Sequence, residues 1–215
     1  MNKKYISEFI GSFFLVATVI GSGIMGVNMS GGNNGVALLG NTIATGAILF
    51  VLIKMFGSVS GAHFNPAVSI VFFLRKELDF KNLLNYIVCQ MAGGLLAVIT
   101  IHYIFEITII QISTNIRGEL PLLVSEIIAT SGLILTILFV IKHDKNSVAT
   151  AVALFITAGY WFTSSTSFAN PMVTISRIYT DTFTGIAPSS IPYFLIGQFI
   201  GIFVAHFIYK SFDEN

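Results

Sequence analysis

Two asparagine–proline pairs are the candidate chemical groups of this apolar chain: Asn65-Pro66 in SGAHFNPAVSI and Asn170-Pro171 in SFANPMVTISR. Proline suits the first position of a helix, because its missing N–H would be unpaired there anyway. Asparagine suits the N-cap before it. Each pair therefore predicts the start of a helix, where about half a positive charge and an amide donor meet. Such a junction can hydrogen-bond a neutral polar molecule, while it repels cations and prevents proton hopping along ordered waters.

The composition places these pairs in a membrane protein. Of the 215 residues, 54% are hydrophobic and 10% are charged, whereas soluble domains carry roughly 25% charged residues. Because unpaired strand edges are not tolerated in lipid, we expect an all-α membrane protein. Apolar runs of about 20 residues predict six transmembrane helices, at 5–25, 35–57, 83–105, 122–141, 147–165 and 191–209. Pro66–Arg75 and Pro171–Thr180 predict two half-helices of ~15 Å each.

The landmarks of the first half recur in the same order in the second half. The matching pairs are Glu8 with Glu126, Asn65-Pro66 with Asn170-Pro171, Gln90 with Gln198, Gly93 with Gly201 and Ala97 with Ala205. Three spans in each half, an odd number, require the halves to insert with opposite topology, and such inverted repeats place the site at broken helices near the midplane. We expect one channel domain, 1–215, with repeat halves 1–110 and 118–215.

The basic residues predict the orientation. With a cytoplasmic N-terminus, the inner side would hold Lys3, Lys4, Lys54, Arg75, Lys76, Lys81, Lys142, Lys145 and Lys210, and the outer side Arg117 and Arg177. Basic residues concentrate on the cytoplasmic side of membrane proteins. We therefore expect a multi-pass protein of the inner or plasma membrane with both termini in the cytoplasm.

The two motifs resemble those of the aquaporin and aquaglyceroporin family, also called major intrinsic proteins. SGAHFNPAVS is similar to the family's first signature and FANP to its second, and the resemblance covers essentially the whole chain. It implies six helices with two re-entrant half-helices, a pore in each subunit, a homotetramer and passive transport without a cofactor. It assigns the pore junction to Asn65, Pro66, Ala67, Asn170, Pro171 and Met172. TDTFTG, with an arginine-free filter, resembles bacterial members associated with arsenic resistance.

The selectivity filter departs from the family pattern. Counting from the two Asn residues assigns the filter to Thr45, Ala158, Ser167 and Val173. The family usually has arginine where Val173 stands, so we expect a wide, uncharged filter. Met172 replaces an alanine of the second signature. We interpret it as a packing residue, with a narrowed junction as the alternative.

Further polar residues have two interpretations each. Arg177 shares a helical face with Val173 and could line the outer mouth, or it could pair with Asp181 at the surface. His63 is expected in the inner vestibule, or in a loop hydrogen bond. Glu8 and Glu126 could relay protons, but we expect them to brace the re-entrant loops by accepting hydrogen bonds from backbone N–H groups.

Several classes of function are disfavoured. One cysteine and four scattered histidines predict no metal site, and no basic patch for nucleic acid is present. The favoured function is a passive channel in the lipid bilayer for small neutral solutes: glycerol-like polyols, undissociated arsenite or methylated arsenicals, and some water. The alternatives are a water-selective aquaporin, a proton-coupled transporter using Glu8, Glu126 and His63, or a structural membrane protein.

Overall fold

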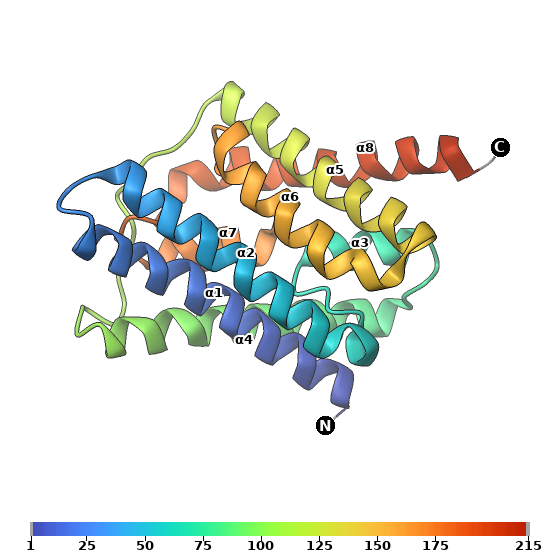
Figure 1. The fold of residues 1–215 in the computed structure, drawn as a ribbon, viewed down its shortest axis with the longest axis horizontal. Helices are drawn as coiled ribbons and strands as arrows, with labels where there is room; N and C mark the ends of the chain where they lie inside the picture. The colour runs from blue at the N-terminus through green and yellow to red at the C-terminus, as the bar shows by residue number, and fades with distance from the viewer. Residues whose placement is uncertain (1, 214–215) are drawn as a thin grey trace.

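The computed structural model describes residues 2–213, which form helices and loops without a β-strand. The long helices are α1 (Lys3–Met29), α2 (Asn34–Ser60), α4 (Phe80–Ile104), α5 (Leu120–His143), α6 (Val148–Phe162) and α8 (Ile191–Asp213). Two short helices, α3 (Pro66–Leu74) and α7 (Pro171–Ser176), lie inside the bundle (Figure 1). The six long helices and two half-helices thus have the predicted order.

The asparagine–proline pairs start the two half-helices as predicted. Asn65 caps α3, and its Oδ1 accepts a hydrogen bond from the N–H of Ala67 at 2.8 Å. Asn170 caps α7 in the same way, accepting from the N–H of Met172 at 3.0 Å. The second half-helix is shorter than predicted, because α7 ends at Ser176 and a 3₁₀ turn continues over Arg177–Tyr179.

Five segments are long and apolar enough to cross a membrane: Lys3–Met29, Asn34–Ser60, Phe80–Ile104, Leu120–His143 and Pro188–Phe212. The remaining long helix, α6, has 15 residues, which corresponds to ~22 Å. The predicted span at 147–165 is therefore wrong at its C-terminal end. Thr163 adopts an extended conformation there, since the chain turns into the second re-entrant loop.

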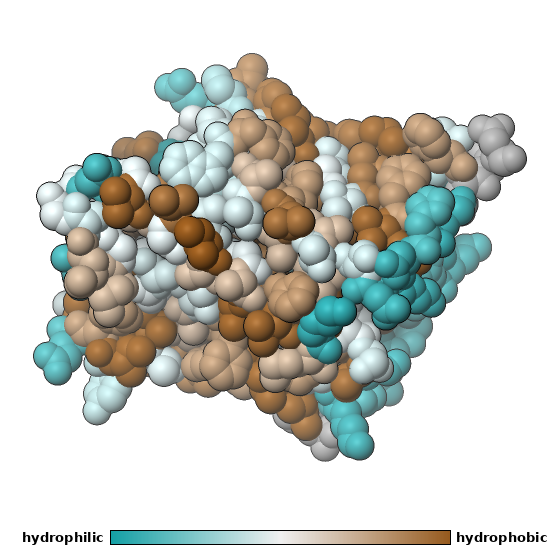
Figure 2. Space-filling model, in the orientation of Figure 1, coloured by the Kyte–Doolittle hydropathy of each residue, from teal (hydrophilic) through white to brown (hydrophobic). Residues whose placement is uncertain are grey.

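Both termini lie towards one end of the bundle, opposite the α1–α2 turn (Figure 1). Hydrophilic residues gather at the end with the termini, while apolar residues cover much of the flank (Figure 2). We call these the termini end and the far end. An apolar flank between two more polar ends is what a lipid bilayer requires of a helical protein.

Small residues let the helices approach closely at matching positions of the two halves. A Cβ on Gly93 in α4 would lie 2.2 Å from the carbonyl oxygen of Phe9 in α1. A Cβ on Gly201 in α8 would lie 2.8 Å from the Cβ of Thr130 in α5. Close approach at small residues is a common mode of helix association in membranes. The contact of Gly93 with Phe9 packs α4 against α1, and the contact of Gly201 with Thr130 packs α8 against α5.

Candidate pore and selectivity filter

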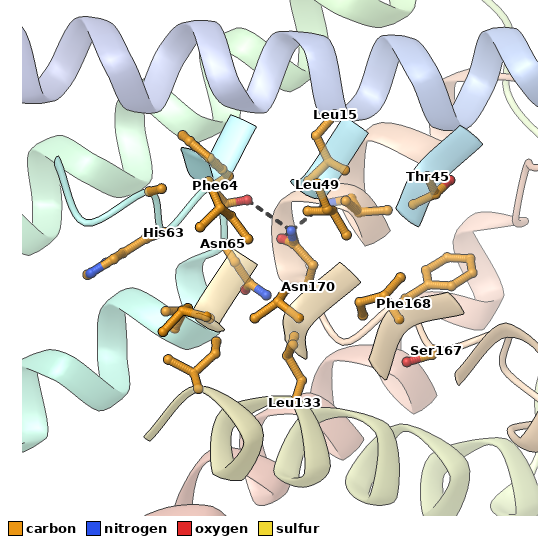
Figure 3. Close-up of a pocket in the computed structure, with 18 of the residues that line it drawn as sticks. Leu15, Thr45, Leu49, His63, Phe64, Asn65, Leu133, Ser167, Phe168 and Asn170 are labelled. Carbon is orange, nitrogen blue, oxygen red and sulfur yellow. Dashed lines mark hydrogen bonds between the residues drawn. The ribbon is translucent and has the colours of Figure 1, made fainter. Parts of the chain in front are cut away.

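The two re-entrant loops meet through a reciprocal pair of hydrogen bonds. Asn65 Nδ2 donates to the carbonyl oxygen of Ala169 at 2.7 Å. Asn170 Nδ2 donates to the carbonyl oxygen of Phe64 at 2.9 Å (Figure 3). Each asparagine therefore caps its own half-helix with its oxygen and holds the opposite loop with its nitrogen. The N-termini of α3 and α7 are fixed against each other at the centre of the bundle.

The loops reach this junction through backbone conformations that are unusual for residues with a side chain. Ala62 and Phe64 have φ values of 52° and 47°, and the matching Ser167 and Ala169 have 48° and 47°. Left-handed conformations of non-glycine residues cost roughly 1–2 kcal/mol each. The surrounding hydrogen bonds must offset that cost in both loops.

Two buried glutamates supply those hydrogen bonds. Glu8 accepts from the N–H of His63 at 3.0 Å and from that of Phe64 at 2.7 Å. Glu126 accepts from the N–H of Phe168 at 3.0 Å and from that of Ala169 at 2.9 Å. Both side chains are completely buried. These are the contacts that the bracing interpretation predicts.

A glutamine completes each brace. Gln90 Nε2 donates to Glu8 Oε2 at 2.8 Å, and Gln198 Nε2 donates to Glu126 Oε2 at 2.6 Å. The partners of Glu126 are therefore all donors, which an ionised carboxylate satisfies and a protonated carboxyl does not. Neither glutamate lines the cavity described next, so a proton-relay role has no geometric support.

A cavity of about 90 Å³ runs past the junction and is lined by residues of both halves. Seven of the residues that the sequence assigns to a pore line it: Thr45, His63, Asn65, Ser167, Asn170, Val173 and Arg177. His63 lies on one side of the two asparagines, and Thr45 and Ser167 lie on the other (Figure 3). His63 Nδ1 also lies 3.0 Å from Ser69 Oγ, so the vestibule position and the loop hydrogen bond coexist.

The assignment of Ala158 to the filter is wrong. Ala158 is exposed on α6 and does not line the cavity. Tyr160, two residues later, is buried and lines it, and its hydroxyl oxygen lies 3.2 Å from Thr45 Oγ1. Counting back from Asn170 fails because it assumes a fixed loop length between α6 and the second signature.

The expectation of an uncharged filter lacking arginine is also wrong. Position 173 is valine, but the Arg177 side chain lines the same cavity and is only 4% exposed. Arg177 Nε donates to the carbonyl oxygen of Thr184, and its Cζ lies 3.6 Å from the centroid of the Phe168 ring. The alternative pairing with Asp181 does not form, because Asp181 Oδ1 accepts from the N–H of Thr114 at 2.8 Å.

Four residues that the resemblance assigns to the pore junction do not line the cavity: Pro66, Ala67, Pro171 and Met172. Ala67 and Met172 are completely buried. A Cβ on Gly94 of α4 would lie 2.5 Å from Met172 Sδ, so the methionine occupies the space that Gly94 leaves free. This contact supports the packing interpretation of Met172.

The cavity lining combines hydrocarbon with polar groups. The long helices α1, α2, α5 and α6 contribute ten aliphatic side chains: Leu15, Val19, Leu49, Ile53, Leu133, Ile137, Ile141, Val148, Val152 and Ile156. The re-entrant loops contribute polar residues, among them Asn65, Ser167 and Asn170. Ser167 Oγ is buried and has no hydrogen-bond partner within residues 2–213. A solute in the cavity thus meets both hydrocarbon and polar groups.

The profile described as "Major intrinsic protein" matches residues 1–164. The chain belongs to the major intrinsic protein family. Members of this family are channels and not enzymes. The match ends before the second asparagine–proline pair, the region in which Met172, Val173 and Arg177 depart from the family pattern.

Individual relatives agree with this membership. The chain is 42% identical to "Aquaglyceroporin AqpS" of Rhizobium meliloti (strain 1021) over 201 residues, which cover 94% of this chain and 86% of the relative. It is 30% identical to "Probable aquaporin NIP4-2" of Arabidopsis thaliana over 98% of this chain and 74% of the relative. The aquaglyceroporin of Plasmodium falciparum, known from an X-ray structure, has the same fold, with a TM-score of 0.74 at 22% identity, covering 98% of this chain and 94% of that one.

This major intrinsic protein is therefore an integral membrane protein with the aquaporin-like fold, and it is a passive channel for small solutes. Residues 2–213 contain no group of three or more His, Cys, Asp or Glu side chains placed to hold a metal ion. The chemistry available at the pore is hydrogen bonding and electrostatics.

Proposed function

We propose that the channel passes small neutral solutes with several hydroxyl groups, namely glycerol-like polyols and undissociated arsenite or methylated arsenicals, with some water. One observation carries the proposal: the cavity past Asn65 and Asn170 is lined by aliphatic side chains together with polar groups, and the buried Ser167 hydroxyl is unpaired. A polyol carries both C–H groups and hydroxyls and can contact both kinds of lining. The name of the relative "Aquaglyceroporin AqpS" supports the same solute class.

Electrostatics favour neutral solutes over cations. The N-termini of α3 and α7 meet at the junction, and each contributes roughly half a positive charge. Arg177 adds a full positive charge to the cavity wall. A cation that enters loses hydration and meets only positive potential, so the pore excludes cations and protons.

The oligomeric state and orientation belong to the same proposal. We propose a homotetramer, with both termini in the cytoplasm, of an inner or plasma membrane. Apolar side chains exposed on the flank, such as Phe14, Ile43, Val88, Leu154 and Phe199, support burial in lipid or against other subunits. The matching Glu8 and Glu126 contacts support a division into repeat halves at 1–110 and 118–215.

Proteoliposomes test this function. Light scattering after an osmotic step measures permeability to water, glycerol and urea, and arsenite uptake is followed separately. We expect glycerol and arsenite permeability well above that of empty liposomes, unchanged by a protonophore. Water permeability without glycerol permeability would indicate the water-selective alternative. Loss of flux with a protonophore would indicate the proton-coupled alternative, and no flux of any solute would indicate a structural protein.

A further inference from the structure

A second cavity, of about 320 Å³, opens at the far end of the bundle. We call it the far-end vestibule. Its polar lining comes from Asn34, Asn41, Asn115, Arg117, Thr166 and Arg177. Arg177 also lines the pore, so the vestibule leads directly to the filter. Arg177 contributes to cation exclusion at this entrance, but that role does not require the second guanidinium, that of Arg117.

The two guanidiniums are close together and partly free. Both Cζ atoms approach the ring of Phe168, at 5.6 Å for Arg117 and 3.6 Å for Arg177. Arg117 donates from Nη2 to the carbonyl oxygen of Ser164 at 2.9 Å and makes a long contact from Nη1 to Thr166 Oγ1 at 3.5 Å. Arg177 uses only Nε, and its two terminal nitrogens have no hydrogen-bond partner within residues 2–213.

Within residues 2–213, no carboxylate forms an ion pair with either arginine. The ion pair found among these residues joins Arg75 and Glu77. Glu126 is the carboxylate that attracts both guanidiniums electrostatically. Its oxygens already accept hydrogen bonds from loop N–H groups. Burial lowers the pKa of Arg117, and the two guanidiniums repel each other. Arg177 is buried and Arg117 is half-buried. Because an unpaired buried charge is costly, an anion beside Arg177 would be stabilised, and Arg117 adds a second positive charge at the same place.

We propose that the far-end vestibule binds a small free oxyanion, a carboxylate or a phosphate-like ion, between Arg117 and Arg177. The guanidinium fork matches two oxygens of such an anion through parallel charge-assisted hydrogen bonds. The free terminal nitrogens of Arg177 bind one edge of the anion, and the N–H groups of Arg117 that do not point at Ser164 or Thr166 bind another. A bound anion occupies the entrance and reduces the access of neutral solutes to the filter. The binding site does not depend on which neutral solute the channel carries.

Isothermal titration calorimetry tests the site on the purified channel in dodecyl maltoside, which has no phosphate group. Sodium phosphate and sodium acetate are the two probes, titrated at constant ionic strength. We expect saturable binding of at least one probe to wild type. R117Q should weaken that binding about tenfold or more, since charge-assisted hydrogen bonds are worth roughly 1.5–3 kcal/mol.

R75Q is the matched control, because Arg75 lies outside both cavities, beside Glu77 and over the Tyr209 ring. The affinity of R75Q for phosphate and acetate should equal that of wild type. If R117Q does not fold, R117K replaces it, and the loss of the fork should still weaken binding. The proposal is overturned if wild type binds neither probe, if the Arg117 variant binds as tightly as wild type, or if R75Q weakens binding as much.

Discussion

The hydroxyl oxygen of Tyr160 on α6 lies 3.2 Å from Thr45 Oγ1 on α2, across one end of the pore cavity. Thr45 Oγ1 also donates to the carbonyl oxygen of Asn41 at 2.8 Å, which fixes the position of the threonine. The tyrosine is therefore held over the cavity by the helix that faces it. Tyr160 lines the cavity and Ala158 does not, and we infer from this contact that Tyr160 is the residue of α6 that limits the width of the filter.

The first prediction concerns this assignment. Tyr160→Ala should raise the permeability to erythritol relative to glycerol, because removal of a buried aromatic ring widens the filter. Ala158→Leu is the control and should leave both permeabilities unchanged, because residue 158 is exposed. Osmotic light scattering of proteoliposomes measures both. A change in the Ala158 variant with none in the Tyr160 variant would restore the assignment made by counting.

The second prediction concerns the brace in the second half. Glu126→Gln replaces one acceptor oxygen by an NH₂ group among donors: the N–H groups of Phe168 and Ala169 and the amide of Gln198. We expect a loss of roughly 1–3 kcal/mol in stability for the unsatisfied group, measured as a lower thermal unfolding midpoint. Glu119→Gln, at an exposed position without a capping hydrogen bond, should change little. Equal midpoints for both variants would contradict the brace.

The third prediction concerns Met172. Gly94→Ala should destabilise the protein by roughly 1–3 kcal/mol, since its Cβ would lie 2.5 Å from Met172 Sδ and 2.6 Å from Ser176 Oγ. Adding Met172→Ala should recover part of the loss, and thermal unfolding of the single and double variants measures the coupling. Gly40→Ala, where no atom lies within 4 Å, is the control. Strictly additive effects at Gly94 and Met172 would show that the two residues do not share space.

Much of the architecture was predictable because it rests on short-range chemistry. Apolar runs locate long helices in any lipid environment, and the Asn-Pro pairs locate helix starts by their own hydrogen bonds. The glutamates were predictable too, since buried N–H groups of a loop need acceptors and Glu8 and Glu126 recur at matching places. Neither inference required knowledge of how distant segments pack.

The filter was less predictable because it depends on where loops bend. Between α6 and α7 the chain bends through Thr166, Ser167 and Ala169, whose positive φ values no residue type in the sequence signals. Within α6, Tyr160 lines the cavity and Ala158 does not. Arg177 was placed by α-helical spacing from Val173, although it begins a 3₁₀ turn. The spacing predicted that Arg177 lies on the same side as Val173, but only the structure shows its contact with the Phe168 ring.

Val173 tests the central claim most directly. Val173 is buried at the cavity wall near Arg177, and an arginine there would add bulk and a further positive charge to the filter. Val173→Arg should reduce glycerol and arsenite permeability at least about tenfold, the effect of ~1.4 kcal/mol on a barrier, and reduce water permeability much less. The block should persist at high salt, because bulk is not screened as charge is.

The measurement compares water, glycerol and arsenite permeability of proteoliposomes at equal protein density for wild type, Val173→Arg and the control Val173→Ala. The alanine variant keeps a small uncharged side chain and should transport glycerol at least as fast as wild type. The account predicts a large fall in the ratio of glycerol to water permeability for the arginine variant alone. An arginine variant that passes glycerol and arsenite as fast as wild type would show that residue 173 does not line the constriction and would contradict the proposed path.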